Sequence, residues 1–522
     1  MTTRPTDGPY ARLLTRPWPR AAAAVAAGAL PALTFPTPSL WWLAYVALVP
    51  WLSLIRTAPG ARRAALDGWL GGGGFLLAVH HWLLPSLHVF ILVLAALLGL
   101  LWAPWGVLVQ RLLGGSPGPV RAAWALFAVP SGWLMVELAR SWEYLGGPWG
   151  LFGASQWQVA PALKLASVGG IWLVSFLLVA LNTAISTVIW ASRARITGLV
   201  GLVACTAVVA GVWVWAPSPR AAGTVRIALV QPGVVDGTGS VERRFEREEA
   251  LTRGLAGQRM DLVVWGESGV GGDLTEHPGL RDRLTALSRA VGADLLVNVD
   301  ARRSDRPGIF KSSVLVGPGG PTGDRYDKMR LVPFGEYVPA RSLLGWATSV
   351  GKAAGEDRKR GDHQVVMRLP ATRSAPEGLR LGPLVCFESA FPDMSRQLAR
   401  DGAQVIVAQS STSTFQDSWA PWQHASLAAL RAAETWRPVV HSTLTGVSTV
   451  ADPRGRAAGP PLGTGRSTAV VRDVPLGGGT SPYVRYGDWI VLASVAVVAG
   501  TCAAGGVAAV RRRVRKPGPA RP

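Results

Sequence analysis

Long runs without a charged residue alternate with polar stretches along this chain of 522 residues. A helix needs roughly 20 predominantly apolar residues to cross a bilayer. The pattern therefore predicts at least six membrane-spanning segments. They lie in the windows without Asp, Glu, Lys or Arg, which are residues 21–55, 68–110, 122–136, 165–192, 196–219 and 489–510.

The first two windows are too long for a single crossing, and prolines interrupt both of them. Pro31, Pro36 and Pro38 fall in the first window and Pro85 falls in the second. Since proline breaks a helix, each window is expected to form a helical hairpin, which brings the total to eight spans. Residues 1–219 would hold seven of them and residues 488–510 the eighth. A cleavable signal peptide over residues 1–34 is the alternative, because arginines precede an alanine-rich run there.

The distribution of Lys and Arg among the short loops predicts the orientation, because cytoplasmic loops carry an excess of these residues. With the N-terminus inside, the outer loops hold only Arg140 and Lys164. Residues 220–487 are then expected outside the cytoplasm and residues 511–522 form a basic cytoplasmic tail. Topology thus explains the formal charge of +21 without nucleic-acid binding. The inner segments carry Arg4, Arg12, Arg16, Arg20, Arg56, Arg62, Arg63, Arg111, Arg121, Arg193, Arg195 and the tail RRRVRK.

From Thr224 onward, short β-rich runs alternate with amphipathic helical stretches, a pattern typical of an α/β domain of about 250 residues. A Pro-Arg-Gly sequence at 453–455 suggests a hairpin turn. Strands are expected at 224–231, 261–268, 293–300, 312–317, 381–389, 403–410, 438–443 and 446–453. Helices are expected at 241–255, 280–292, 393–402 and 424–436.

Three reactive side chains lie at or near the ends of predicted strands, where α/β sheets usually place their ligands. Cys386 is the only one of the three cysteines outside the apolar windows, Glu267 follows DLVVWG, and Lys328 lies in RYDKMRLVPFGEYVP. A carboxylate can deprotonate a thiol, and an ammonium can stabilise the resulting thiolate. The alternatives are a packing thiol and two ordinary surface ion-pair members.

These motifs resemble the Glu, Lys, Cys constellation of the nitrilase superfamily. WGES contains Glu267, YDKMRLVPFGEYVP contains Lys328 and Glu336, and VCFES contains Cys386 and Glu388. The PFGEYVP block, the surrounding spans and the stretch GGPWGLFGASQ at 146–156 are similar specifically to the apolipoprotein N-acyltransferase family. The resemblance implies an extracytoplasmic αββα sandwich on a polytopic helical membrane domain.

The resemblance also implies a reaction in which Cys386 takes an acyl chain from a membrane phospholipid as a thioester. The acyl group then passes to the α-amino group of the diacylglyceryl-cysteine of an apolipoprotein. Glu267 would be the general base, and Lys328 would stabilise the oxyanion together with the backbone N–H of Phe387. Glu336 and Glu388 would support the site. The location implied is the bacterial cytoplasmic (inner) membrane, with both termini in the cytoplasm.

Burial is expected to raise the pKa of the Glu267 carboxyl, and Lys328 to lower the pKa of the thiol. No cofactor or metal is expected, and no Walker-type glycine loop occurs. Trp149, Trp419 and Trp422 are candidate contacts for lipid or acceptor.

One segment departs from the family. STSTF, residues 411–415, stands where relatives commonly carry an Asn-Asp-x-Trp-Phe run, which puts acyl or acceptor specificity in doubt. A membrane-tethered amidase and a weakly active scaffold paralogue therefore remain alternatives. His424 and His441 invite a Cys-His protease interpretation, but no such local signature surrounds Cys386.

Overall fold

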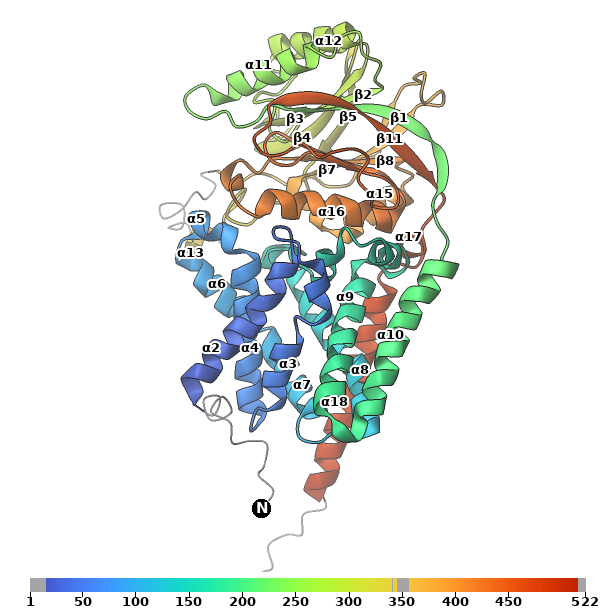
Figure 1. Cartoon of the computed structure of the whole chain (residues 1–522). Coiled ribbons are helices and arrows are strands. Elements are labelled where there is room, and N and C mark those ends of the chain that lie inside the picture. The colour runs from blue at the N-terminus through green and yellow to red at the C-terminus, as the bar shows by residue number, and fades with distance from the viewer. Residues whose placement is uncertain (1–15, 340, 345–355, 515–522) are drawn as a thin grey trace, which may run out of the picture.

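A bundle of helices lies beneath an α/β domain in the computed structural model (Figure 1). The structure describes residues 16–339, 341–344 and 356–514. The ends of the predicted basic segments, residues 1–15 and 515–522, lie outside the described residues.

The bundle is built mainly from the apolar windows of the sequence. Four helices are long and apolar enough to cross a membrane, namely α8, α9, α10 with the turn before it, and α18, and the bent pair α6 and α7 could make a fifth span. The bundle helices are α2 (Pro17–Ala29), α3 (Val49–Arg56), α4 (Ala61–Val79), α5 (Leu84–Leu87), α6 (Phe90–Gly99), α7 (Trp102–Leu113), α8 (Pro119–Arg140), α9 (Ala160–Trp190), α10 (Arg195–Trp215) and α18 (Trp489–Val514).

The two proline-containing windows form shorter helices than the spans predicted from them. The first window folds into α2, two 3₁₀ turns and α3, and the second into the end of α4, the short α5, then α6 and α7. Each prolyl residue removes a backbone donor and ends regular helix nearby. The described helices include four or five candidate spans, so the two hairpins and the total of eight spans stay predictions.

The α/β domain contains two sheets. The six-stranded sheet has the order β11-β1-β2-β3-β4-β5, and the five-stranded sheet has the order β10-β9-β8-β7-β6. The first sheet comprises β1 (Arg220–Gln231), β2 (Leu262–Val264), β3 (Asp294–Arg302), β4 (Ile309–Gly317), β5 (Gly320–Asp327) and β11 (Thr468–Gly478). The second comprises β6 (Met367–Leu369), β7 (Leu379–Val385), β8 (Val405–Ser410), β9 (Val439–Thr443) and β10 (Thr449–Ala451).

The alternation of side chains along β1 shows how the two sheets pack. Ile227 and Leu229 join the core between the sheets, whereas Ala228 and Val230 join a second core beneath two helices. Those helices are α11 (Ser240–Arg253) and α12 (Pro278–Val291). Because successive strand residues face opposite sides, an apolar run such as VRIALV supplies both layers. The result is a four-layer αββα sandwich, as the resemblance implied.

The remaining helix layer joins the sandwich to the bundle. It consists of α15 (Pro392–Arg400) and α16 (Ala420–Thr435), followed near the end of the domain by α17 (Pro482–Tyr486). One continuous apolar core includes residues of both α16 and α9, and the Glu434 carboxylate accepts a hydrogen bond of 2.8 Å from the backbone of Ile171. This bond falls at a break in α9, where Gly170 has φ +67°. The α/β domain is therefore packed directly on the bundle.

Candidate active site

Cys386 lies where β7 ends and a 3₁₀ turn, η7 (Cys386–Ala390), begins. Its backbone has φ +52°, a conformation that side chains with a Cβ rarely adopt. Such strain is found most often at functional sites, where surrounding structure fixes it. Here the sharp strand-to-turn change presents a half-buried thiol at the end of the sheet.

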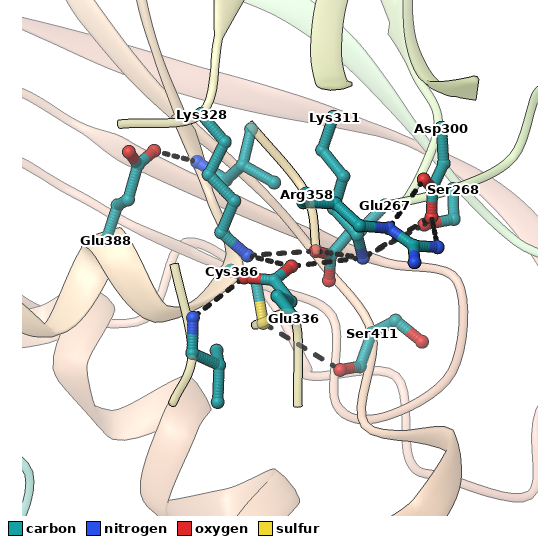
Figure 2. A network of polar contacts seen from close by, with 12 residues as sticks. Glu267, Ser268, Asp300, Lys311, Lys328, Glu336, Arg358, Cys386, Glu388 and Ser411 are labelled. Carbon is teal, nitrogen blue, oxygen red and sulfur yellow. Dashed lines mark hydrogen bonds and ion pairs between the residues drawn. The ribbon is translucent and has the colours of Figure 1, made fainter. Parts of the chain in front are cut away.

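Glu267 and Lys328 meet in front of this turn. Glu267 follows β2, and its backbone N–H donates to the carbonyl of Ser410 at the end of β8, which holds the two sheets together at this point. Lys328 follows β5 and is fully buried. Its Nζ lies 3.1 Å from Glu267 Oε1 and 2.8 Å from Glu336 Oε1 (Figure 2). Two carboxylates therefore hold one buried ammonium.

A second lysine, which the sequence analysis did not single out, completes the charge cluster. Lys311 Nζ lies 2.9 Å from Glu267 Oε1, 3.3 Å from Glu336 Oε1 and 3.7 Å from Asp300 Oδ2. Figure 2 shows both lysines converging on Glu267. A signal for Lys311 was present in β4, since alternation puts it on the same face as Leu315, which joins the core between the sheets.

The charges of the cluster set its protonation state and correct the expected pKa values. Burial alone would raise the pKa of Glu267, but Lys311 and Lys328 outweigh it and lower that pKa to about 2. Burial and the negative charge of Glu267 raise the pKa of the Cys386 thiol to about 12, against the smaller lowering by Lys328. The expectation for both groups was wrong in direction, because it counted one lysine and gave too little weight to the burial of the thiol. The resting site holds a neutral thiol beside an ionised carboxylate.

Glu388 supports the nucleophile turn from behind. Its Oε2 accepts from the backbone N–H of Val385 at 2.8 Å, while Oε1 accepts from the Tyr326 hydroxyl and the Met329 N–H, both at 2.7 Å. The carboxylate thus joins the residues before Cys386 to the segment carrying Lys328. The Phe387 N–H lies in the first turn of η7, where helical N–H groups lack internal acceptors, and this suits the predicted oxyanion contact.

The thiol contacts the segment that departs from the family pattern. Cys386 Sγ lies 3.9 Å from the carbonyl oxygen of Ser411, to which it donates (Figure 2). His424 does not act on the sulfur in this arrangement, because its Nε2 lies 3.0 Å from the Cys386 carbonyl and 2.9 Å from Ser389 Oγ. Burial lowers the pKa of His424 to about 4. A neutral histidine that fixes the nucleophile turn fits this geometry better than a protease base.

Aromatic side chains from both parts of the chain lie together beside the site. Trp149 Nε1 donates to Gln423 Oε1 at 2.8 Å, and the same oxygen accepts from Trp82 at 3.2 Å. The Trp82 ring lies 4.9 Å from Phe415, in the departing segment. Trp419 packs edge-on against His81 at 4.4 Å. Trp422 is partly exposed. Of the candidate aromatics, Trp149 and Trp419 contact the junction between the domain and the bundle.

The arrangement supplies a thiol nucleophile, an ionised base and buried cations for an oxyanion, which is the chemistry of acyl transfer. Within the described residues, no group of three or more His, Cys, Asp or Glu side chains could hold a metal ion.

Comparison with known proteins first identifies the class of protein to which the two parts of the chain are similar. Residues 226–480 match the carbon–nitrogen hydrolase family, and residues 27–184 match the apolipoprotein N-acyltransferase N-terminal domain. A carbon–nitrogen hydrolase superfamily protein from Xanthomonas campestris aligns with 48% of this chain and 91% of its own, at 20% identity and a TM-score of 0.36.

Full-length relatives then give the family. An apolipoprotein N-acyltransferase of Geobacter metallireducens is 30% identical over 506 residues, covering 91% of this chain and 94% of the relative. The enzyme of the same name from Azotobacter vinelandii is 31% identical over 541 residues, covering 98% and 99%. The chain belongs to the apolipoprotein N-acyltransferase family.

Proposed function

We propose that this chain is an integral membrane acyltransferase that N-acylates apolipoproteins, with a membrane phospholipid as acyl donor and Cys386 as acyl carrier. Family membership over most of the chain supports the lipoprotein reaction. The observation that carries the residue roles is the buried set of Glu267, Lys328 and Glu336 next to a strained cysteine. A soluble amidase would have no use for the apolar helices beneath this site.

In the first half-reaction, Sγ of Cys386 attacks the ester carbonyl carbon of the phospholipid. The thiol proton moves to Glu267 as the C–S bond forms, since neither a free thiolate nor a protonated carboxyl is populated at rest. Lys328 and the Phe387 N–H stabilise the oxyanion. Collapse of the intermediate breaks the ester C–O bond, and the proton on Glu267 leaves with the lysophospholipid alcohol. A thioester remains on the enzyme.

In the second half-reaction, the uncharged α-amino group of the diacylglyceryl-cysteine attacks the thioester carbonyl. Glu267 takes a proton from the attacking nitrogen and returns it to sulfur as the C–S bond breaks. The products are an amide and the resting thiol, so charge and protons balance without a nucleotide. Glu336 holds Lys328 in place through both steps at 2.8 Å.

Lipids would reach the sulfur through the aromatic junction of bundle and domain. Trp149, Trp82 and Phe415 offer apolar surface at the site, and Trp419 and the partly exposed Trp422 extend it outward. The serines and threonines of STSTF are smaller than the indole that the family commonly carries in this segment. We therefore expect the departing segment to tune the acyl or acceptor preference without changing the reaction.

The proposed membrane placement keeps eight spans, with residues 1–219 as the membrane domain, 220–487 as the catalytic domain on the outer face of the bacterial cytoplasmic membrane, 488–510 as the last span and 511–522 as the tail. The arginines at the end of α3 and the start of α10 support this orientation, because these helix ends lie away from the catalytic domain (Figure 1).

The experiment that tests the function is complementation of a bacterium lacking its own N-acyltransferase. Triacylated lipoprotein should reappear with the wild-type chain and not with Cys386→Ala, as judged by mass spectrometry of the lipoprotein N-terminus. Restoration by the alanine variant would show that Cys386 is not the acyl carrier. Failure of the wild type would indicate a scaffold, or a hydrolase if free fatty acid is released.

A further inference from the structure

A cavity of about 300 Å³ lies at the junction of the bundle and the catalytic domain, at the opposite end of α16 from the site. His424 and Ala433 are nine residues apart on α16, which corresponds to about 14 Å along the helix. The cavity is therefore separate from the catalytic residues. Its lining comes from α9, α10, α16, and the turn after β10, and consists of Ala160, Leu163, Lys164, Ser167, Trp213, Ser218, Pro219, Ala433, Trp436, Pro453, Arg454 and Arg456.

The polar lining is cationic. Lys164, Arg454 and Arg456 line the cavity, and no acidic side chain does so among the residues described. None of the three cations forms an ion pair within the described part of the chain. The nearest carboxylate along the chain, Asp452, is already engaged by the backbone N–H groups of Arg454 and Arg456 at 2.8 and 2.9 Å. Lys164 donates to the neutral hydroxyl of Ser218 at 2.5 Å.

The turn that carries the two arginines packs tightly against α16 and also contacts α9 of the bundle. Gly455 has φ +79°, and a Cβ there would lie 2.4 Å from the Ala429 carbonyl oxygen on α16 and 3.1 Å from Leu163 Cδ2 on α9. Cations of the catalytic domain therefore face a cation of the bundle across a fixed junction. Like charges at short range repel, so an anion between them would stabilise the junction.

The surroundings of the cavity suit a lipid. Trp213, Ser218 and Pro219 in its lining place the cavity at the end of α10, just before the chain enters β1. Only 11% of the apolar window of α10 is buried, so most of this helix is free to contact acyl chains. Trp213, in the last turn of α10, is 48% exposed, and indoles are enriched at membrane interfaces.

We propose that this cavity binds the phosphate of an anionic membrane phospholipid, whose acyl chains lie along α10. The phosphate pairs with Lys164 on one side and with Arg454 and Arg456 on the other, and so fastens the catalytic domain to the bundle. Basic pockets between membrane helices recognise lipid headgroups by the same charge logic. This lipid is structural and is not the acyl donor.

The test uses the full-length chain with Cys386→Ala, so that no lipid is consumed. Native mass spectrometry and thermal unfolding are measured with added phosphatidylglycerol, phosphatidylcholine or inorganic phosphate. The cavity variant carries Lys164→Gln, Arg454→Gln and Arg456→Gln. A matched control removes the same charge from exposed arginines outside the cavity lining, by Arg259→Gln, Arg368→Gln and Arg373→Gln.

We expect phosphatidylglycerol to bind and stabilise the parent and the control, and to bind the cavity variant about 100-fold more weakly. If the triple variant does not fold, Arg454→Gln alone should weaken binding about fivefold. Equal binding by cavity variant and control would overturn the proposal. Equal effects of phosphatidylcholine, or of inorganic phosphate, would also overturn it, since they would show that the negative headgroup or the lipid itself is not recognised.

Discussion

Replacement of Lys311 by methionine tests how the charge cluster sets the base. Its Nζ lies 2.9 Å from Glu267 Oε1, and at an effective dielectric constant of 20 this pair attracts by roughly 6 kcal/mol before the opposing terms of burial and neighbouring charge. Lys328 stays in the variant and keeps part of the effect. We expect the pKa of Glu267 to rise from about 2 by roughly 2 to 3 units, which is about 3 to 4 kcal/mol.

The change should appear in the pH dependence of the first half-reaction. Glu267 accepts a proton only when ionised, so in the wild type the base stays competent well below pH 4. In Lys311→Met, the carboxyl takes up a proton as the pH falls through about 4 to 5, and the rate should drop there. The assay follows the rate of Cys386 acylation by phospholipid with mass spectrometry between pH 4 and 8, which avoids the titrating amine of the acceptor.

Lys311→Arg keeps the positive charge and is the control, with an expected profile close to that of the wild type. A Lys311→Met profile that stays as flat as the wild type down to pH 4 would refute the assignment of Lys311 as a positioning charge for Glu267.

Three further changes follow from the site. Glu388→Gln places the NH₂ group of an amide against at least one buried N–H donor. We expect this variant to lose about 2 to 3 kcal/mol of stability and to be acylated more slowly, whereas the control Glu356→Gln, at an exposed position, should change neither. Gly147→Ala brings a Cβ to 2.5 Å from the ring of the residue after the nucleophile and should lower the melting temperature more than Gly146→Ala, which has positive φ but open space. Burial lowers the pKa of His424 to about 4, so between pH 6.5 and 4 only the unfolded chain takes up the proton of this residue. As the pH falls through this range, His424 alone should lower the free energy of unfolding by up to about 1.4 kcal/mol per pH unit, and thermal unfolding of His424→Gln should show a shallower pH dependence than that of the wild type.

Much of the catalytic domain could be predicted because its strands carry their own signal. Each expected strand coincides at least in part with an observed one, and the run that Glu267 follows does end at the site. Three strands were missed because none of them forms an apolar β-rich run. They are β5, with the sequence GPTGDRYD, β6, with three residues, and β11, with Arg472, Asp473 and Pro475 in its sequence. Their places in the sheets come from pairing with β4, β7 and β1.

The protonation state and the span count could not be derived from the sequence. A lysine within a strand is usually solvated, so the sequence does not show that Lys311 belongs to the site. Its role becomes visible only in the fold, where β2 and β4 bring it to Glu267. The pKa values of Glu267 and Cys386 depend on how many charged groups the fold places near them. Hydropathy found the apolar windows, but where Pro31, Pro36 and Pro38 interrupt the first one, tertiary packing decides how long each helix becomes.

The proposed mechanism requires that the sulfur of Cys386 carries the acyl chain. Intact-mass and peptide mass spectrometry of the full-length enzyme, incubated with phospholipid and no acceptor, measures this directly. We predict one acyl adduct on Cys386 that hydroxylamine removes, strongly reduced in Lys328→Met and absent in Cys386→Ala. Acyl transfer to lipopeptide by the alanine variant, or an adduct on a different residue, would contradict the mechanism.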